Sequence, residues 1–431
     1  MPNRLDPKRL KSAKLALFVI FFTQGFAAIT TLPRIPELID QIGVNFAQWG
    51  AIIGFAGLGS LLPLVFTNKL VNRFGTSPVI KVSAIAITLV LMSLAWITDP
   101  VLFFIAYTVQ SFSFSTFNIA LNAQAVMFQK KLGKVLLGSF HGSWSIGAAS
   151  SAAVSGILAT FLPLWLHLVI VPILVFIAFQ LSGNYLLSPS EDGHEAEKPK
   201  AGDKKVSWLA TPGYLWFLAL GLWAGMWPEL VMMEWSAVFS RDVLQLEAGR
   251  GALPYTLFVA AMIVGRFSVV HITKRIHFST MSQWGGLIGS VMMGIGVFWS
   301  SAIVTNGDAS TLADRVDAAL TVQVVFFALA GLGIASMVPS FYSAAGDIRG
   351  LTTAQALSRM SLANALMMML AKVIMGALAE GPGLEAAFVF PIASFLAAGI
   401  IAGVVVKKSK KLQAENASAY PPTGPISTLD A

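Results

Sequence analysis

Apolar residues fill most of the chain in twelve long stretches, and short polar segments separate them. The hydrocarbon core of a bilayer takes about 20 helical residues to cross, and a helix satisfies its own backbone amides there. The first stretch, LALFVIFFTQGFAAITTLP, follows Lys14. The others begin near Trp49, Val79, Val101, Leu136, Trp165, Gly213, Gly251, Ser282, Ala318, Ser361 and Ala386. The pattern predicts an all-α membrane protein with twelve transmembrane helices.

Composition and charge agree with this prediction. The chain is 56% hydrophobic and 12% charged and has no cysteine, which excludes disulfides, thiolate metal sites and cysteine nucleophiles. With the N-terminus inside, 24 of the 29 lysines and arginines fall in cytoplasmic segments; Arg34, Arg241, Arg250 and Arg315 fall outside, and Lys372 lies within a span. This is the positive-inside distribution, and it predicts that both termini are cytoplasmic. The formal charge of +8 therefore reflects topology, and we expect no nucleic-acid partner.

The longest polar interruption, residues 188–207, divides the spans into six and six. Its charged, proline-containing sequence SPSEDGHEAEKPKAGDKKVS predicts a flexible cytoplasmic linker. Transporters with two homologous halves have this arrangement. We expect six-helix bundles at 1–187 and 208–411 and a disordered cytoplasmic tail at 412–431, which is polar with a double proline. Basic segments after span 2 (NKLVNRFG) and span 8 (VHITKRIH) suggest a faint internal repeat.

Twelve spans, a central linker and a short basic loop after span 2 resemble the major facilitator superfamily over essentially the whole chain. The loop signature of that superfamily is roughly Gly-x-x-x-Asp-Arg-x-Gly-x-Arg/Lys. Arg73 and Gly75 match it, while Asn68, Asn72 and Ser77 replace the first glycine, the aspartate and the final basic residue. The segments SFHGSWSIGA and EWSAVF resemble the fucose-permease-like branch and its uncharacterised inner-membrane relatives. The resemblance implies a monomer in a bacterial inner membrane, alternating access between two bundles, a cavity lined by spans 1, 4, 7 and 10, and a gating role for Arg73 and Gly75.

Enzyme signatures are absent from the sequence. It has no phosphate-binding loop of the Gly-x-x-x-x-Gly-Lys-Ser/Thr type, no His-Glu-x-x-His and no Gly-x-Ser-x-Gly. The five histidines are too scattered to suggest a metal cluster. We therefore expect no catalytic activity, no cofactor and no metal site, and transport driven by a gradient of a proton or another ion.

Ionisable residues inside spans are costly and indicate function by default. In span 7, Trp216, Trp223, Trp227 and Glu234 fall within about 20° of one helical line. This line predicts an aromatic wall for a flat solute that ends at a proton-coupling carboxylate near the outer mouth. The alternative is that the tryptophans face lipid or pack between helices and that Glu234 lies at the outer rim. Pro228 breaks the backbone bonding of this helix.

Glu229 lies on another face of span 7 and needs a partner if it is charged. Lys372, deep in span 11, provides one, because spans 7 and 11 are neighbours in the fold that the resemblance implies. Ser361, Asn364 and Met368 share a helical face with Lys372. We therefore predict a Glu229–Lys372 pair; the alternative is that Lys372 extends to the surface through its long stem.

Polar residues in spans 1, 4 and 5 are further candidates. Asn118 and Asn122 share a stripe of span 4 with Ser111 and Ser115, and either bind solute or hold helices together. His141 in span 5 either carries a proton or is neutral and bonded locally, and Trp144 follows one turn later as a candidate for binding. Gln24 lies near the middle of span 1.

These residues favour a transporter for a small neutral polar solute, such as a sugar or polyol, with proton coupling. A proton-driven efflux pump for amphipathic compounds is the alternative, because spans 1 and 4 lack a central acid. A channel lacks its charge rings, and a non-transporting sensor usually carries an added soluble domain. The direction of transport, the substrate and the coupling ion stay open.

Overall fold

The computed structural model is helical and describes residues 6–419, apart from 134–135, 193–210, 248, 273–275, 277, 307, 347, 349–350 and 352. Its described part contains no β-strand. The N-terminal half consists of α1 (Pro7–Ile29), η1 (Leu32–Arg34), α2 (Ile35–Ile42), α3 (Phe46–Ala56), η2 (Gly57–Ser60), α4 (Pro63–Phe74), α5 (Thr76–Ser93), α6 (Pro100–Leu132), α7 (Leu137–Ala159) and α8 (Leu164–Gly183). The short helix α9 (Pro189–Asp192) follows.

The second half repeats this organisation. It consists of α10 (Gly213–Asp242), η5 (Arg250–Ala252), α11 (Leu253–Ile272), α12 (Phe278–Thr305), η6 (Ala309–Thr311), α13 (Leu312–Ile334), α14 (Met337–Gly346), α15 (Thr353–Glu380), α16 (Leu384–Ala387) and α17 (Val389–Ala419). Eleven segments of the described chain are long and apolar enough to cross a membrane. The twelfth predicted span corresponds to α7, which is 23 residues long but rich in serine and glycine. The twelve-helix prediction is therefore confirmed.

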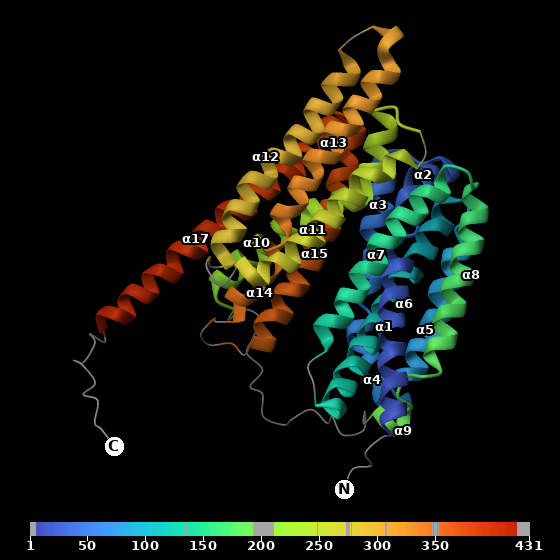
Figure 1. Cartoon of the computed structure of the whole chain (residues 1–431), viewed down its shortest axis with the longest axis vertical. Coiled ribbons are helices and arrows are strands. Elements are labelled where there is room, and N and C mark those ends of the chain that lie inside the picture. The colour runs from blue at the N-terminus through green and yellow to red at the C-terminus, as the bar shows by residue number, and fades with distance from the viewer. Residues whose placement is uncertain are drawn as a thin grey trace.

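The two halves form two groups of helices that meet at one end (Figure 1). We call this the far end; it holds Asn45 and Glu380. The opposite, terminal end holds the first turn of α1 and helix α9, and there the two groups diverge (Figure 1). Contacts between the halves join α3 to α15 and α7 to α11, that is, span 2 to span 11 and span 5 to span 8. These two pairs are related by exchange of the halves, as expected for a protein built from two repeats.

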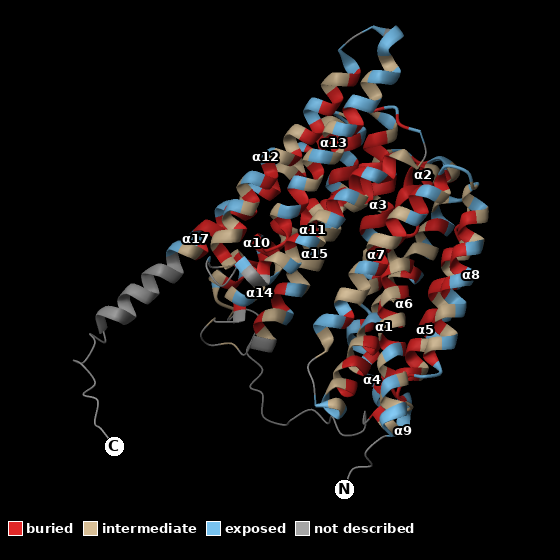
Figure 2. Ribbon diagram, viewed as in Figure 1, coloured by how far each residue is buried: buried red, intermediate tan, exposed pale blue. Residues whose placement is uncertain are grey.

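Polar contacts at the far end also join the halves. The backbone N–H of Phe46 donates to Glu380 Oε2 at 3.0 Å, and Arg241 Nη1 lies 2.6 Å from Asp40 Oδ2. Buried residues concentrate where helices face one another, and exposed ones follow the outer surfaces (Figure 2). One apolar core contains residues of both halves at the far end, whereas a second core belongs to the N-terminal half alone. Burial of this shared apolar core therefore holds the far end closed.

Helix α9 docks the start of the predicted linker onto the N-terminal half. Asp192 Oδ2 accepts hydrogen bonds of 2.9 Å from the backbone N–H and the hydroxyl of Thr76, at the first turn of α5. Gly75 has φ +82°, and a Cβ there would lie 2.8 Å from Pro189, so a side chain at position 75 would displace α9. The prediction that residues 188–207 form a flexible linker is therefore wrong for 189–192, because a carboxylate at a helix N-terminus is stabilised there. Residues 193–207 lie outside the described chain.

An ion pair fixes the same helix from the other side. Arg9 Nη2 lies 2.6 Å from Glu191 Oε2, and the Arg9 guanidinium also donates to the carbonyls of Tyr185 and Leu186. The hydrogen bond from Arg9 lowers the pKa of Glu191 from 4.5 to about 2, so this contact is present throughout the physiological pH range.

The predicted disordered tail begins as helix. Helix α17 continues through Ala419, which corrects the prediction for residues 412–419. The segment from Lys411 to Glu415 consists of good helix formers, and the helix ends before the double proline at 421–422. Residues 420–431 lie outside the described chain.

Candidate functional site

Helices α10 and α15 lie side by side in a fixed register. Asn364 Nδ2 lies 3.6 Å from the sulfur of Met226, and Lys372 Nζ donates to Glu234 Oε1. In both pairs the partners are 138 residues apart in sequence. The two helices also begin at the terminal end, and Glu234 and Lys372 come at similar distances along them. This register selects Glu234, and not Glu229, as the partner of Lys372.

The Glu234–Lys372 pair is nearly sealed from solvent. The side chain of Lys372 is 17% exposed and that of Glu234 is 7% exposed. Glu234 Oε2 is buried and has no hydrogen-bond partner. The prediction that Glu229 pairs with Lys372 is therefore wrong, and Glu234 lies inside the closed far end and not at an open mouth. Tyr107 of α6 and Tyr255 of α11 lie within electrostatic range of Glu234.

Glu229 has a different partner, on α11. Arg266 Nη2 lies 3.4 Å from Glu229 Oε2, and Tyr255 lies within the field of both groups. This contact was not predicted: Arg266 is one of the 24 basic residues counted in cytoplasmic segments, but it lies within the helix Leu253–Ile272. Its position well before the basic cluster at residues 274–275 was the signal available in the sequence. Two carboxylates of α10 are thus neutralised by two different neighbouring helices.

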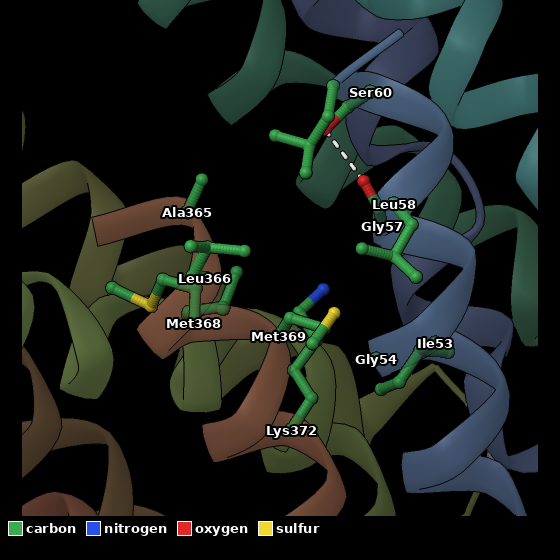
Figure 3. Close-up of a pocket in the computed structure, with 12 residues that line it drawn as sticks. Ile53, Gly54, Gly57, Leu58, Ser60, Ala365, Leu366, Met368, Met369 and Lys372 are labelled. Atoms are coloured by element: carbon green, nitrogen blue, oxygen red, sulfur yellow. Dashed lines mark hydrogen bonds between the residues drawn. The ribbon is translucent and has the colours of Figure 1, made fainter. Parts of the chain in front are cut away.

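A pocket of about 240 Å³ lies between the halves beside Lys372. Its walls come from α3 and η2 on one side and from α10 and α15 on the other (Figure 3). The residues are Ile53, Gly54, Gly57, Leu58, Ser60, Leu61, Leu230, Ala365, Leu366, Met368, Met369 and Lys372. Lys372 is the one ionisable residue in this lining, and leucine and methionine side chains form most of the rest. The pocket therefore combines an apolar surface with a single ammonium group.

The register predicts the outcome of a double-mutant cycle. Removing one member of a buried pair strands the other and costs about 3–5 kcal/mol. We expect Glu234→Gln and Lys372→Met to couple by about 1–3 kcal/mol in the free energy of unfolding, measured in mixed micelles. The cycle of Glu229→Gln with Lys372→Met is the control and should be additive within about 0.5 kcal/mol. Coupling in the second cycle but not in the first would contradict the register.

Two tryptophans of the line in span 7, Trp223 and Trp227, contact another helix, as in the second of the two predicted alternatives. The ring of Phe390 on α17 lies 5.5 Å from the ring of Trp227 and 6.0 Å from that of Trp223. Trp227 is fully buried. The line of residues predicted in span 7 packs against α17 at this level, so Trp227 belongs to the helix-packing interface and not to a surface open to solute. Trp216 is 38% exposed.

The polar candidates of spans 1, 4 and 5 meet in the N-terminal half. Gln24 Nε2 lies 3.4 Å from Asn118 Oδ1, and Asn122 Nδ2 donates to the same oxygen at 3.0 Å. Asn122 Oδ1 lies 3.0 Å from His141 Nε2; an amide oxygen only accepts, so Nε2 of His141 donates. Asn118 and His141 are exposed, and Gln24 Oε1 is buried without a partner. The sequence thus identified four residues of one network across three helices.

Three other predicted residues, Trp144, Arg73 and Gly75, contact other parts of the protein. Trp144 is half-buried and packs against both apolar cores. Arg73 lies over the ring of Phe74 at 5.2 Å, and Gly75 separates α4 from α5 under α9. The loop after span 2 is therefore in contact with the start of the linker.

A buried network at the far end was not predicted. Arg34 is 1% exposed; its Nη1 donates to both carboxylate oxygens of Glu37, and its Nε donates to His167 Nδ1 at 3.2 Å. His167 Nε2 lies 3.0 Å from Thr30 Oγ1, which also contacts Ser155. These contacts join α1, α2, α7 and α8. Nothing in the local sequence places His167 beside Arg34, because they are more than a hundred residues apart.

Comparison with known proteins identifies relatives of the chain. Residues 17–313 match the family model of the Major Facilitator Superfamily. An uncharacterized MFS-type transporter of Yersinia pestis is 26% identical over 78% of this chain and 81% of its own length. An uncharacterized transporter of Sinorhizobium fredii is 24% identical over 90% and 96%.

Solved structures share the fold at low sequence identity. A variant of the nucleoside transporter NupG has a TM-score of 0.72 at 13% identity, covering 91% of this chain and 99% of that chain. The D-xylose-proton symporter has a TM-score of 0.66 at 13% identity, covering 91% and 97%. At these identities the likeness establishes the fold alone.

Proposed function

The chain belongs to the major facilitator superfamily, and we propose that it is a secondary active transporter that moves a small polar solute across the bacterial cytoplasmic membrane by coupling it to a proton. The observation that carries this proposal is the Glu234–Lys372 pair beside a pocket between the two halves. A carboxylate that is sealed in one conformation and hydrated in another changes its proton affinity with the conformation. Such a group converts a proton gradient into a conformational bias.

The relatives support the same class of function. The matched bacterial proteins are described as transporters, and two neighbours in fold are a nucleoside transporter and a sugar-proton symporter. The network of Gln24, Asn118, Asn122 and His141 supplies amide and imidazole groups for a polar solute. These groups lie in the N-terminal half, and Lys372 reaches the pocket from the C-terminal half, as alternating access requires of a site that both halves share.

Orientation and domain boundaries are part of this proposal. The basic residues favour a cytoplasmic terminal end, which makes the closed far end the outer gate and the structure inward-facing. Bundles at 1–187 and 208–411 then move against each other, and α9 keeps the start of the linker attached to the first bundle. We further propose that the protein acts as a monomer, because each chain supplies both halves of the site.

Reporter fusions test this orientation. We expect fusions after Pro189 and after Lys411 to report the cytoplasm, because most of the 29 basic residues lie on that side of the proposed topology. Alkaline phosphatase and green fluorescent protein fusions give opposite signals in the two compartments. A fusion after Asp308, in the α12–α13 connection, is the control that should report the exterior. An exterior signal at either of the first two sites would contradict the orientation.

Efflux of amphipathic compounds is the second candidate. The leucine and methionine lining of the pocket favours it, because such side chains adapt to varied apolar ligands. Direction separates the two functions. In proteoliposomes of defined orientation, an importer moves solute and protons in the same direction, whereas an efflux pump moves solute in the direction opposite to the protons.

Flux measurements test the proposed function itself. Purified protein is reconstituted in vesicles with an imposed pH gradient and a panel of radiolabelled solutes. We expect at least one solute to show saturable movement that stops when a protonophore removes the gradient. Gradient-independent, non-saturable movement of every solute would overturn the proposal.

A further inference from the structure

The pocket between the halves carries one ammonium group and no free carboxylate in its lining. Lys372 on α15, beside Met368 and Met369, lies opposite Gly57 and Leu58 (Figure 3). Its Nζ is held by Glu234 Oε1, behind the lining, while Glu234 Oε2 is buried and has no partner. A solute that enters the pocket therefore meets a cation whose counter-ion lies on the protein side.

Few other charges reach this pair. Tyr107 of α6 and Tyr255 of α11 face it, and both are neutral hydroxyls at physiological pH. Glu229 on the same helix is occupied by Arg266. On α2, Glu37 is bonded to Arg34, and Asp40 is bonded to Arg241 at the far end. Among the described residues, the charge balance at the pocket therefore depends on Glu234 and Lys372.

Charge balance restricts what can accompany a proton. When the site is empty, the carboxylate and the ammonium cancel. When Glu234 takes up a proton, the bond to Lys372 is lost and one positive charge remains in a nearly sealed position, which is strongly unfavourable in a membrane. A neutral solute leaves that charge uncompensated. A solute with one negative charge restores neutrality.

From this balance we infer that the solute is a small monocarboxylate, whose carboxylate replaces that of Glu234 on the ammonium of Lys372 while its less polar body lies against the leucine and methionine wall. The inference rests on the proposed function and refines its solute class from a neutral polar compound to an acid. In each cycle one proton passes to a Glu234 carboxylate oxygen and one carboxylate anion binds Lys372. Both leave on the other side, so no net charge crosses.

Chemical rescue tests whether Lys372 accepts an external carboxylate. In Glu234→Gln the ammonium has lost its counter-ion, so acetate and propionate should raise the melting temperature of the purified protein, whereas acetamide and propionamide should not. In wild type the Glu234 carboxylate competes with acetate for Lys372. The affinity of wild type for acetate should therefore be lower than that of Glu234→Gln by roughly tenfold or more. The double variant Glu234→Gln/Lys372→Met should not respond at all, and its own melting temperature shows whether it folds. Equal responses to acid and amide, or an unchanged response in the double variant, would overturn the inference.

Transport by wild type supplies the second test. Lactate is compared with propane-1,2-diol, and 3-hydroxybutyrate with butane-1,3-diol, in vesicles that report internal pH. We expect the acids to carry protons at a rate that does not change when potassium and valinomycin set the membrane potential, since the cycle is electroneutral. Proton-driven accumulation of a neutral partner, or flux that follows the potential, would overturn the acidic solute class and leave the proposed transporter intact. Absence of any proton-coupled flux, for acids and neutral solutes alike, would count against the proposed function itself.

Discussion

Replacement of Glu234 by glutamine is expected to abolish accumulation of solute against a gradient while binding and equilibrium exchange persist. Glutamine keeps the size of the side chain and its hydrogen-bonding capacity but cannot titrate. The proton gradient then has no group through which to act, although the pocket and Lys372 remain. Uphill uptake should fall to the level of empty vesicles, whereas counterflow between labelled and unlabelled solute should stay within about threefold of wild type, as for a change that spares substrate binding.

The control for this substitution is Glu191→Gln. Glu191 is also an ion-paired carboxylate, but it lies on α9, away from the pocket. The Glu191→Gln variant should therefore accumulate solute as wild type does. If Glu234→Gln loses counterflow together with accumulation, Glu234 binds solute directly. If accumulation persists at every pH tested, the coupling residue is elsewhere, and Glu229 and His141 are the next carboxylate and imidazole to replace.

The helices were readable from the sequence because each depends on a local property. Apolar length determines whether a segment can cross the membrane, and all twelve predicted stretches correspond to helices. The contact of span 7 with span 11, taken from the family resemblance, is also present as α10 with α15. Even α7, which is rich in serine and glycine, was recognised from its length and its position between polar segments.

Pairing between helices could not be read in the same way. Whether Lys372 meets Glu229 or Glu234 depends on how α15 is rotated and shifted along α10, which the packing of both helices decides. A helical wheel places Trp223, Trp227 and Glu234 on one line, yet the tryptophans contact Phe390 on α17 and the carboxylate contacts α15. The three residues do share one face of α10, but that face packs against α17 at the tryptophans and against α15 at Glu234.

The polar network of the N-terminal half shows the opposite case. Gln24, Asn118, Asn122 and His141 were chosen one by one, as polar residues in apolar surroundings. They come together because amide and imidazole side chains of neighbouring membrane helices hydrogen-bond across the helix interfaces, and few other polar partners exist in an apolar bundle. Because polar residues are rare in these spans, their presence alone predicted that they contact one another. The same holds for Glu229 and Glu234 of α10, which both have a charged partner, although the partner predicted for Glu229 was wrong.

Opening of the far end should depend on a glycine crossing between α3 and α15. A Cβ added at Gly50 would lie 2.7 Å from Gly376 Cα and 2.7 Å from the Lys372 carbonyl, and one added at Gly376 would lie 2.5 Å from the Phe46 carbonyl. These neighbours are backbone atoms, which cannot turn aside as a flexible side chain does. The closed far end therefore requires glycine at both positions, next to the Lys372 pair.

We expect Gly50→Leu to hold the far end open and to reduce transport by about a hundredfold or more, because a conformational cycle stops when one of its states is disfavoured by several kcal/mol. The chain has no cysteine, so Ser60→Cys in the pocket provides a single reporter. Labelling of this cysteine by an impermeant maleimide from the far side should increase in Gly50→Leu. Gly138→Leu is the matched control, since a Cβ at Gly138 meets no atom within 4 Å. Because the crossing joins the two halves, unchanged far-side labelling in Gly50→Leu would mean that α3 and α15 separate elsewhere, and the assignment of this crossing as the gate would be wrong.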